Sequence, residues 1–205
     1  MKRAAIVLVL IIILSPGISA DHPDGWGIGI SGIIGLEGDF GAYGGAVSFK
    51  IPQIPIFWNL NAGYFKDTVD HYAIDSIQAG LVADWYFLHK ELVPDIGLHW
   101  YVGAGVWFNH YTHIFHYDND ENYVAVSEGL GLRVPIGLSF QPVESIEIFL
   151  QAVPGIGVNF RFEGKMNDGF VWRRSGVELN HKNSSIELGL RIWLPDNRDK
   201  YEEFI

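Results

Sequence analysis

The stretch IELGLRIWLP, residues 186–195, alternates strictly between two kinds of side chain. Its even-numbered positions are the aliphatic residues Ile186, Leu188, Leu190, Ile192 and Leu194. Its odd-numbered positions are Glu187, Gly189, Arg191 and Trp193. A period of two indicates a β-strand, because successive side chains leave a strand on opposite faces. The stretch therefore predicts a strand with one aliphatic face and one face that carries two opposite charges.

Seven other segments of the chain show the same alternation, so the sequence predicts an all-β protein of eight strands. The eight segments are residues 26–36, 43–51, 56–65, 76–87, 96–108, 129–140, 146–162 and 186–194. None of them has the 3.6-residue period of an amphipathic helix. The connections alternate between short turns that contain proline and longer polar stretches such as residues 66–72, 109–126 and 163–182. This alternation is typical of an antiparallel up-and-down barrel.

The first twenty residues have the features of a secretory signal peptide. Lys2 and Arg3 precede an apolar run over residues 4–14, which is too short to span a bilayer as a helix. A Pro-Gly pair then ends the run, and Ala20 supplies the small residue expected before a cleavage site. We expect a signal peptide at residues 1–20, a barrel at residues 21–194 and a short periplasmic tail at residues 195–205. An uncleaved anchor helix is the alternative.

The composition excludes several classes of protein. The chain has no cysteine, so an exported form has neither a disulfide framework nor a lipidated N-terminal cysteine. Its formal net charge is −10, which argues against attraction to nucleic acid or to an anionic bilayer surface.

The distribution of aromatic residues indicates that the aliphatic face of the barrel meets lipid. Aromatics on that face gather at the segment ends, as expected of two girdles at the headgroup level. The predicted girdle residues are Trp26, Tyr43, Trp58, Tyr64, Trp85, Trp100, Phe108, Phe140 and Phe160. The opposite face is rich in glycine with a few large rings, as the narrow lumen of an eight-stranded barrel requires. A soluble barrel of the lipocalin type, with its charges outside, is the alternative.

Charged residues of both signs share the face that we predict to line the lumen. They are Lys50, Asp84, Arg133, Glu147, Arg161, Glu187 and Arg191. A buried charge is costly unless it is paired, so we expect a network of salt bridges that plugs the lumen. In particular, we expect the arginines to hold Glu147 and Glu187, and Glu187 to interact with Arg191.

The eight segments together resemble the small outer-membrane β-barrel superfamily, typified by the membrane domain of OmpA, by OmpX and by OmpW. The segment ELGLRIWL is similar to the barrel-assembly signal of that superfamily, and Glu187, Gly189, Ile192 and Leu194 match its pattern. The resemblance implies a bacterial outer-membrane location, with membrane lipid and the barrel-assembly machinery as partners. The chain departs from the pattern in its extension over residues 195–205, since such barrels often stop on an aromatic residue.

A structural or surface-interaction protein that displays its loops is the function this pattern favours. A narrow OmpW-like channel for small or hydrophobic solutes is the alternative. The inward-facing glycines Gly103, Gly105, Gly129, Gly131, Gly155 and Gly157 leave room for such a channel. We predict no cofactor and no nucleic-acid partner, and an extracellular ligand would be of unknown identity.

Three weaker patterns lie in the polar connections. His110, His113 and His116 are possible metal ligands, but only a bent loop would bring them together. A lipid-modifying site would draw on His71, His110, Ser127 and Glu128, and a phosphate contact on Arg173, Arg174 and Lys182. Because no motif fixes these residues, we predict neither a metal site nor an enzyme.

Overall fold

The computed structural model describes residues 25–36, 42–52, 54–69, 72–93, 96–117, 122–165, 173–180 and 184–194. They form β1 (Trp26–Gly35), β2 (Ala42–Lys50), β3 (Ile56–Val69), β4 (Tyr72–Val93), β5 (Leu98–Tyr117), β6 (Asn122–Arg133), β7 (Ile136–Val143), β8 (Ile146–Val153), β9 (Gly155–Lys165), β10 (Arg173–Asn180) and β11 (Ser185–Leu194). The predicted signal peptide and tail lie outside these residues. No helix in the described part of the chain is long and apolar enough to cross a bilayer.

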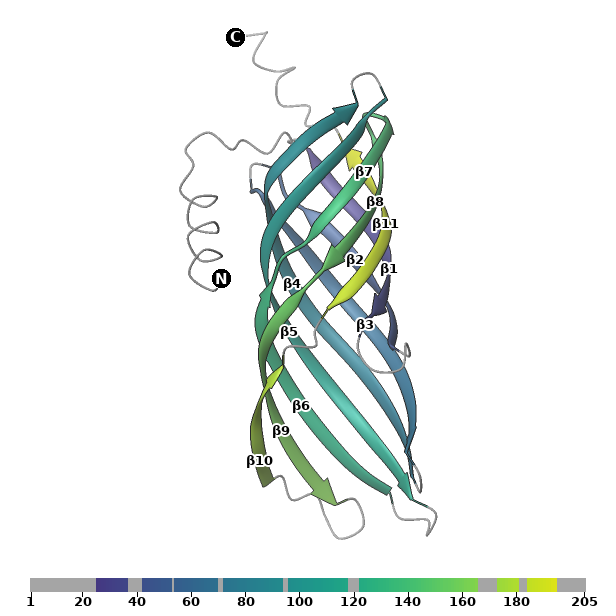
Figure 1. Cartoon of the computed structure of the whole chain (residues 1–205), viewed down its shortest axis with the longest axis vertical. Helices are drawn as coiled ribbons and strands as arrows, with labels where there is room; N and C mark the ends of the chain where they lie inside the picture. The colour runs from purple at the N-terminus through teal and green to yellow at the C-terminus, as the bar shows by residue number, and fades with distance from the viewer. Residues whose placement is uncertain are drawn as a thin grey trace, which may run out of the picture.

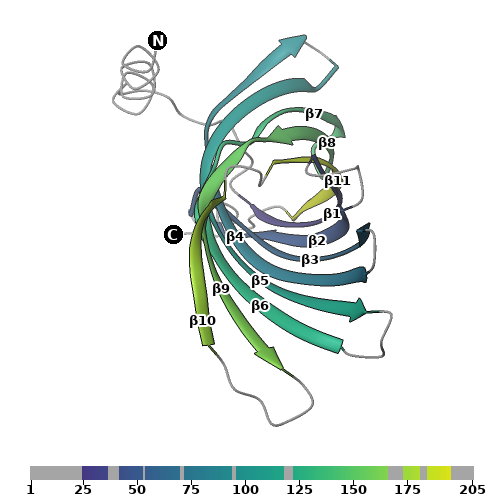
Figure 2. The same cartoon turned by 60° about the horizontal axis from the view of Figure 1, so that its bottom comes forward.

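The strands close into a ring, because β5 pairs with β4 on one side and with both β6 and β7 on the other (Figure 2). Strands β6 and β7 follow β5 in one register, so together they form one strand of the wall. Strands β8 and β9 likewise continue each other, since β8 pairs with β7 and β9 pairs with β6. On their other side, β11 pairs with β8 and β10 pairs with β9. The predicted eight-stranded antiparallel up-and-down barrel is therefore confirmed.

Two prolines cause the breaks within these composite strands. Residues that face each other as a hydrogen-bonded pair in an antiparallel ladder exchange two bonds, but proline has no N–H to donate. The amide of Gly103 donates to the carbonyl of Pro135 at 2.8 Å, and the amide of Val134 donates to the carbonyl of Pro154 at 3.0 Å. The wall stays continuous here, with one bond in place of two at each proline.

One end of the barrel is much taller than the sequence analysis predicts (Figure 1). The stretches 66–72, 109–126 and 163–182, which we predict to be loops, consist largely of strand, since β3, β4, β5, β6, β9 and β10 all extend into them. At the other end, β4 also runs to Val93, beyond the predicted segment 76–87. The loop prediction was wrong because polar side chains on both faces hide the alternation, whereas strand pairing depends on the backbone.

The barrel has an apolar exterior and a polar interior, which is the reverse of a soluble protein. Outward-facing aliphatic side chains are widely exposed, and Leu132 and Ile30 each keep 62% of their surface. Inward-facing side chains are buried, including the carboxylate of Glu147 at 0% exposure. A continuous aliphatic exterior of this kind fits a lipid bilayer. The lipid-facing interpretation holds, and the soluble alternative was wrong.

Candidate functional site

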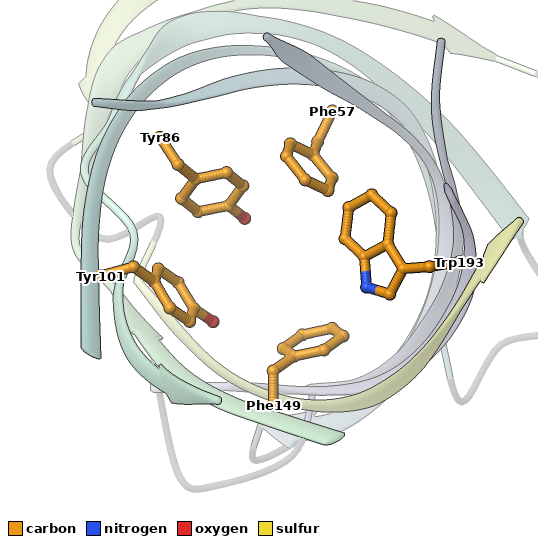
Figure 3. Packing of buried hydrophobic residues seen from close by; sticks show 5 residues of the cluster. All are labelled: Phe57, Tyr86, Tyr101, Phe149 and Trp193. Atoms are coloured by element: carbon orange, nitrogen blue, oxygen red, sulfur yellow. The ribbon is translucent and has the colours of Figure 1, made fainter. Parts of the chain in front are cut away.

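Five aromatic side chains point into the lumen towards the end of the barrel where the turns are short. They point inward from different parts of the wall (Figure 3): Phe57, Tyr86, Tyr101, Phe149 and Trp193. Each is at most 3% exposed. The ring of Tyr86 meets those of Phe57 and Tyr101 edge to face, at centroid distances of 4.8 and 5.0 Å. This geometry suits the quadrupoles of aromatic rings, so the cluster is a packed layer.

Arg191 lies inside this layer of rings. Its guanidinium carbon is 4.0 Å from the ring centroid of Phe149 and 4.7 Å from that of Phe57. Its Nη1 donates to Glu147 Oε1 at 3.1 Å, and the indole N–H of Trp193 donates to the other oxygen of the same carboxylate at 3.0 Å. The cation is therefore both paired and stacked, which offsets much of the cost of removing it from water.

A second group of charges lies next to the aromatic layer. Arg133 Nη2 donates to Glu187 Oε1 at 2.9 Å, and Arg133 Nε lies 3.1 Å from Asp84 Oδ1. Gln151 links the two groups, because its amide N–H donates to Glu187 at 2.7 Å and its oxygen accepts from Tyr101 at 2.9 Å. The interior thus holds one connected polar network that crosses the lumen.

The sequence-predicted lumen residues all occupy inward positions where the structure describes their side chains. Lys50, Asp84, Arg133, Glu147, Glu187 and Arg191 are each at most 9% exposed. The Lys50 ammonium lies 5.8 Å from the ring centroid of Trp193. Among the described residues, these six side chains place three cations and three carboxylates in the interior. The side chain of Arg161 lies outside the described part of the structure.

One expected pairing was wrong. Glu187 contacts Arg133, whereas Arg191 contacts Glu147, its direct partner in the register between β8 and β11. Residues four apart on one strand share a face, but at about 3.3 Å per residue they lie at different levels of the lumen. Glu187 and Arg191 therefore belong to different layers.

Ring side chains fill the space that the inward-facing glycines leave. A Cβ added at Gly131 would lie 2.6 Å from the indole of Trp107, and one at Gly137 would lie 2.6 Å from the ring of Tyr101. Trp107 is itself only 3% exposed. These two glycines thus permit the close approach of large rings.

The sequence analysis missed the neutral members of this network. Tyr86, Tyr101, Gln151 and Trp193 all lie on the inward face that the alternation defines, but their partners come from strands distant in the sequence. Only the buried position of these side chains could have been predicted.

The three histidines of the weak metal candidate do not converge. They lie along β5 in an extended conformation, where His110 and His116 point outward and His113 points inward. His110 pairs with Glu128 at 2.7 Å, His116 with Asp75 at 3.0 Å, and His113 with the hydroxyl of Ser76 at 2.7 Å. No group of three possible metal ligands occurs among the described residues.

Outward-facing charges on the tall end mark where the apolar exterior stops. Asp75 accepts a hydrogen bond from the hydroxyl of Tyr64 at 2.7 Å, beyond the aliphatic part of β4 and outside its membrane-spanning part. That bond is the main reason why the pKa of the Asp75 carboxyl is lower than its ordinary value.

The predicted girdle and assembly residues have the following positions. The girdle residues face outward; Trp26, Tyr43, Tyr64, Trp85, Phe108 and Phe140 are exposed, and Trp58, Trp100 and Phe160 are half-buried. Of the assembly residues, Ile192 and Leu194 are exposed on the outer face of β11, whereas Glu187 and Gly189 face the lumen. Ser127 faces inward and Glu128 outward. His71 and Lys182, and the side chains of Arg173 and Arg174, lie outside the described residues.

A closed ring of eight strands with an aliphatic exterior and a buried polar network defines a transmembrane β-barrel. The chain belongs to the family described as "Protein of unknown function (DUF3996)", whose model matches residues 47–191. No curated protein matches the sequence.

Several solved outer-membrane proteins are similar in structure. A major outer membrane protein from Thermus thermophilus aligns with a TM-score of 0.53 and 12% identity, over 83% of this chain and 98% of that one. The N-terminal β-barrel domain of Pseudomonas aeruginosa OprF has a TM-score of 0.40 and 16% identity, over 83% and 97%. Ail of Yersinia pestis has a TM-score of 0.41 and 13% identity, over 82% and 99%. The Thermus protein confirms the predicted fold, and the predicted outer-membrane location agrees with that fold.

Proposed function

We propose that this protein is an outer-membrane barrel with a closed lumen, which anchors a tall strand wall and its loops at the cell surface. The observation that supports it best is the position of Arg191. Its guanidinium lies against the ring of Phe57 on β3 and that of Phe149 on β8, and it pairs with the carboxylate of Glu147, also on β8, so side chains meet in the middle of the lumen. Side chains that meet in the middle of the lumen support a closed barrel rather than an open channel.

The tall end supports the display function. Strands β4 and β5 span 22 and 20 residues, about twice what is needed to cross a bilayer when tilted. Their outer faces beyond the apolar exterior carry Asp75, His110 and His116, which suit contact with water. A wall that rises clear of the membrane offers a rigid surface for an extracellular partner.

Conductance in planar bilayers tests the closed lumen against the channel alternative. We expect the purified protein to give no unitary current steps. The double variant Glu147→Ala with Arg191→Ala removes the central pair and should give measurable leak. A matched double variant on the outer face, Lys66→Ala with Asp75→Ala, removes two opposite charges that are partners across β3 and β4, and should stay silent. Steady unitary steps from the native protein would contradict the proposal and favour the narrow channel.

We also infer that the exposed end of β11 contacts the barrel-assembly machinery. Ile192 and Leu194 present aliphatic side chains outward, at 47% and 48% exposure, next to the closing strand β1. Replacing Leu194 with Asp should reduce the amount of heat-modifiable, membrane-inserted barrel in cells. Normal insertion of this variant would contradict the inference.

A further inference from the structure

A hydroxyl, an imidazole and a carboxylate are aligned on the outer face of β5 and β6. His110 Nδ1 lies 2.7 Å from Glu128 Oε1, and His110 Nε2 lies 3.3 Å from the hydroxyl oxygen of Thr112. Glu128 faces His110 directly across the two strands, and Thr112 is two residues further along the same face of β5. Strand geometry, rather than a loop, therefore fixes the three groups in a line.

The order of these contacts matches that of an activated nucleophile. With Nδ1 protonated, the imidazole donates to the carboxylate, and Nε2 is left to accept the proton of the hydroxyl. We propose that Thr112, His110 and Glu128 form a hydrolytic site, with Thr112 as nucleophile, His110 as general base and Glu128 orienting the imidazole. This activity would be additional to the display function and does not depend on it.

The position of the site identifies its substrate class as acyl esters of membrane lipids. Thr112 pairs across the strands with Ile77, which is 55% exposed on the same outer face. Phe108 and Leu130 flank the site towards the membrane, at 47% and 53% exposure. An acyl chain can lie on these side chains while its ester reaches Thr112 at the edge of the apolar exterior.

The reaction balances with water as the only co-reactant. The Thr112 oxygen bonds to the ester carbonyl carbon as its proton moves to His110 Nε2, and the carbon–alkoxide bond then breaks as His110 returns that proton to the leaving oxygen. Water, activated by the same imidazole, attacks the acyl-threonine, releases a fatty acid and restores the hydroxyl.

The site predicts slow catalysis. Strand pairing occupies backbone amides of β5, so they are not available as oxyanion donors. The residues that pair with Thr112 across the strands, Ile77 and Val126, are aliphatic and offer no side-chain donor. Loss of a single oxyanion donor slows such enzymes by about 100-fold to 1000-fold. Covalent labelling of the nucleophile is therefore a more sensitive measure than turnover.

A second pair on the same face provides a matched control. His116 lies 3.0 Å from Asp75, but the hydroxyl in that cluster, of Tyr64, donates to the carboxylate. In this pair the hydroxyl of Tyr64 donates to the carboxylate rather than to the imidazole. Its loss should leave the proposed activity unchanged.

The test uses the full barrel, folded in detergent and checked by heat-modifiable mobility. A fluorophosphonate probe should label Thr112, located by peptide mass spectrometry. Thr112→Val and His110→Gln should each lower the labelling rate at least tenfold, whereas His116→Gln should not change it. Thr112→Ser, with a less hindered hydroxyl, should label several-fold faster than the native protein.

Lipid hydrolysis tests the substrate class. In phosphatidylglycerol vesicles, the Thr112→Ser protein should release fatty acid faster than the Thr112→Val protein. Labelling that is absent from both the native and Thr112→Ser proteins, or that persists in Thr112→Val, would overturn the proposal. Equal fatty-acid release by the two variants would overturn the assignment to membrane lipids.

Discussion

Arg191 and Glu147 form an ion pair of 3.1 Å between Nη1 and Oε1, and their side chains are 2% and 0% exposed. The two residues are direct partners across β11 and β8, so the backbone register itself brings them together. Because neither charge reaches water, each depends on the other for its stability inside the lumen.

Removing one member of this pair should cost more than removing both. Glu147→Gln should destabilise the barrel by about 3–5 kcal/mol, since it leaves a buried, uncompensated cation. Adding Arg191→Met should recover part of that loss. The free energy of unfolding, measured by urea titration of the barrel in lipid or detergent, tests this.

A remote residue provides the control for this cycle. Lys66 lies on the outer face of the tall end. The losses of stability caused by Lys66→Met and Glu147→Gln should therefore add to within about 0.5 kcal/mol. Additivity in the Glu147–Arg191 cycle as well would show that the pair does not contribute to stability as a unit.

The glycine that faces Trp107 should tolerate no side chain. Gly131→Ala places a methyl group against the backbone carbonyl of Ile156 and 2.6 Å from the indole of Trp107, and we expect overpacking to cost about 1–3 kcal/mol. Gly32→Ala is the matched control, because a Cβ at that outward position meets no atom within 4 Å. Equal stability of the two variants, measured by thermal loss of the folded band on gels, would mean that Gly131 is not packed against Trp107 and Ile156 as described.

Arginine on the aliphatic exterior should be poorly tolerated. Val134 is an outward-facing residue between β6 and β7 with 41% exposure, and Val134→Arg should cost about 2–4 kcal/mol, the cost of a cation near the bilayer midplane. Ile54→Arg, in the turn between β2 and β3, should cost little, although Ile54 is 40% exposed. Similar losses at both positions would contradict the assignment of this exterior to lipid.

The orientation in the membrane can be tested with single cysteines, because the chain has none of its own. Lys66→Cys, on the tall end, should react with a membrane-impermeant maleimide on intact cells. Glu144→Cys, in the exposed turn between β7 and β8, should react only after the outer membrane is ruptured. The opposite result would place the tall wall in the periplasm.

The sequence predicts which side chains face inward but not which of them meet. Alternation alone assigns Glu147, Glu187 and Arg191 to the lumen, because every strand has the same period of two. The contact between Glu187 and Arg133 depends on the relative stagger of strands across the lumen, which no local pattern records. The same reason explains why Gln151 was missed as the link between the two charge layers.

The length of the strands could not be predicted for a different reason. Beyond Phe108, β5 continues as Asn109 to Tyr117 with polar and aromatic side chains on both faces, so the hydrophobic period disappears. Backbone pairing with β4 and β6 nevertheless continues to His116. That pairing also places His110 and His113 on opposite faces of β5, and it leaves Thr112 beside His110 on the outer face.

The adjoining prolines Pro135 and Pro154 have a mechanical consequence. The Pro135–Gly103 pair and the Pro154–Val134 pair each have one hydrogen bond in place of two. Because Val134 directly precedes Pro135, these two weakened pairs lie next to each other in the wall. When one end of the chain is pulled from a bilayer with a cantilever, such a seam divides two long strands into shorter segments. The extraction of β5 together with β6 and β7 should therefore show two force peaks, separated by a pause near the middle of the wall. Replacing both prolines with valine should merge the two peaks into one.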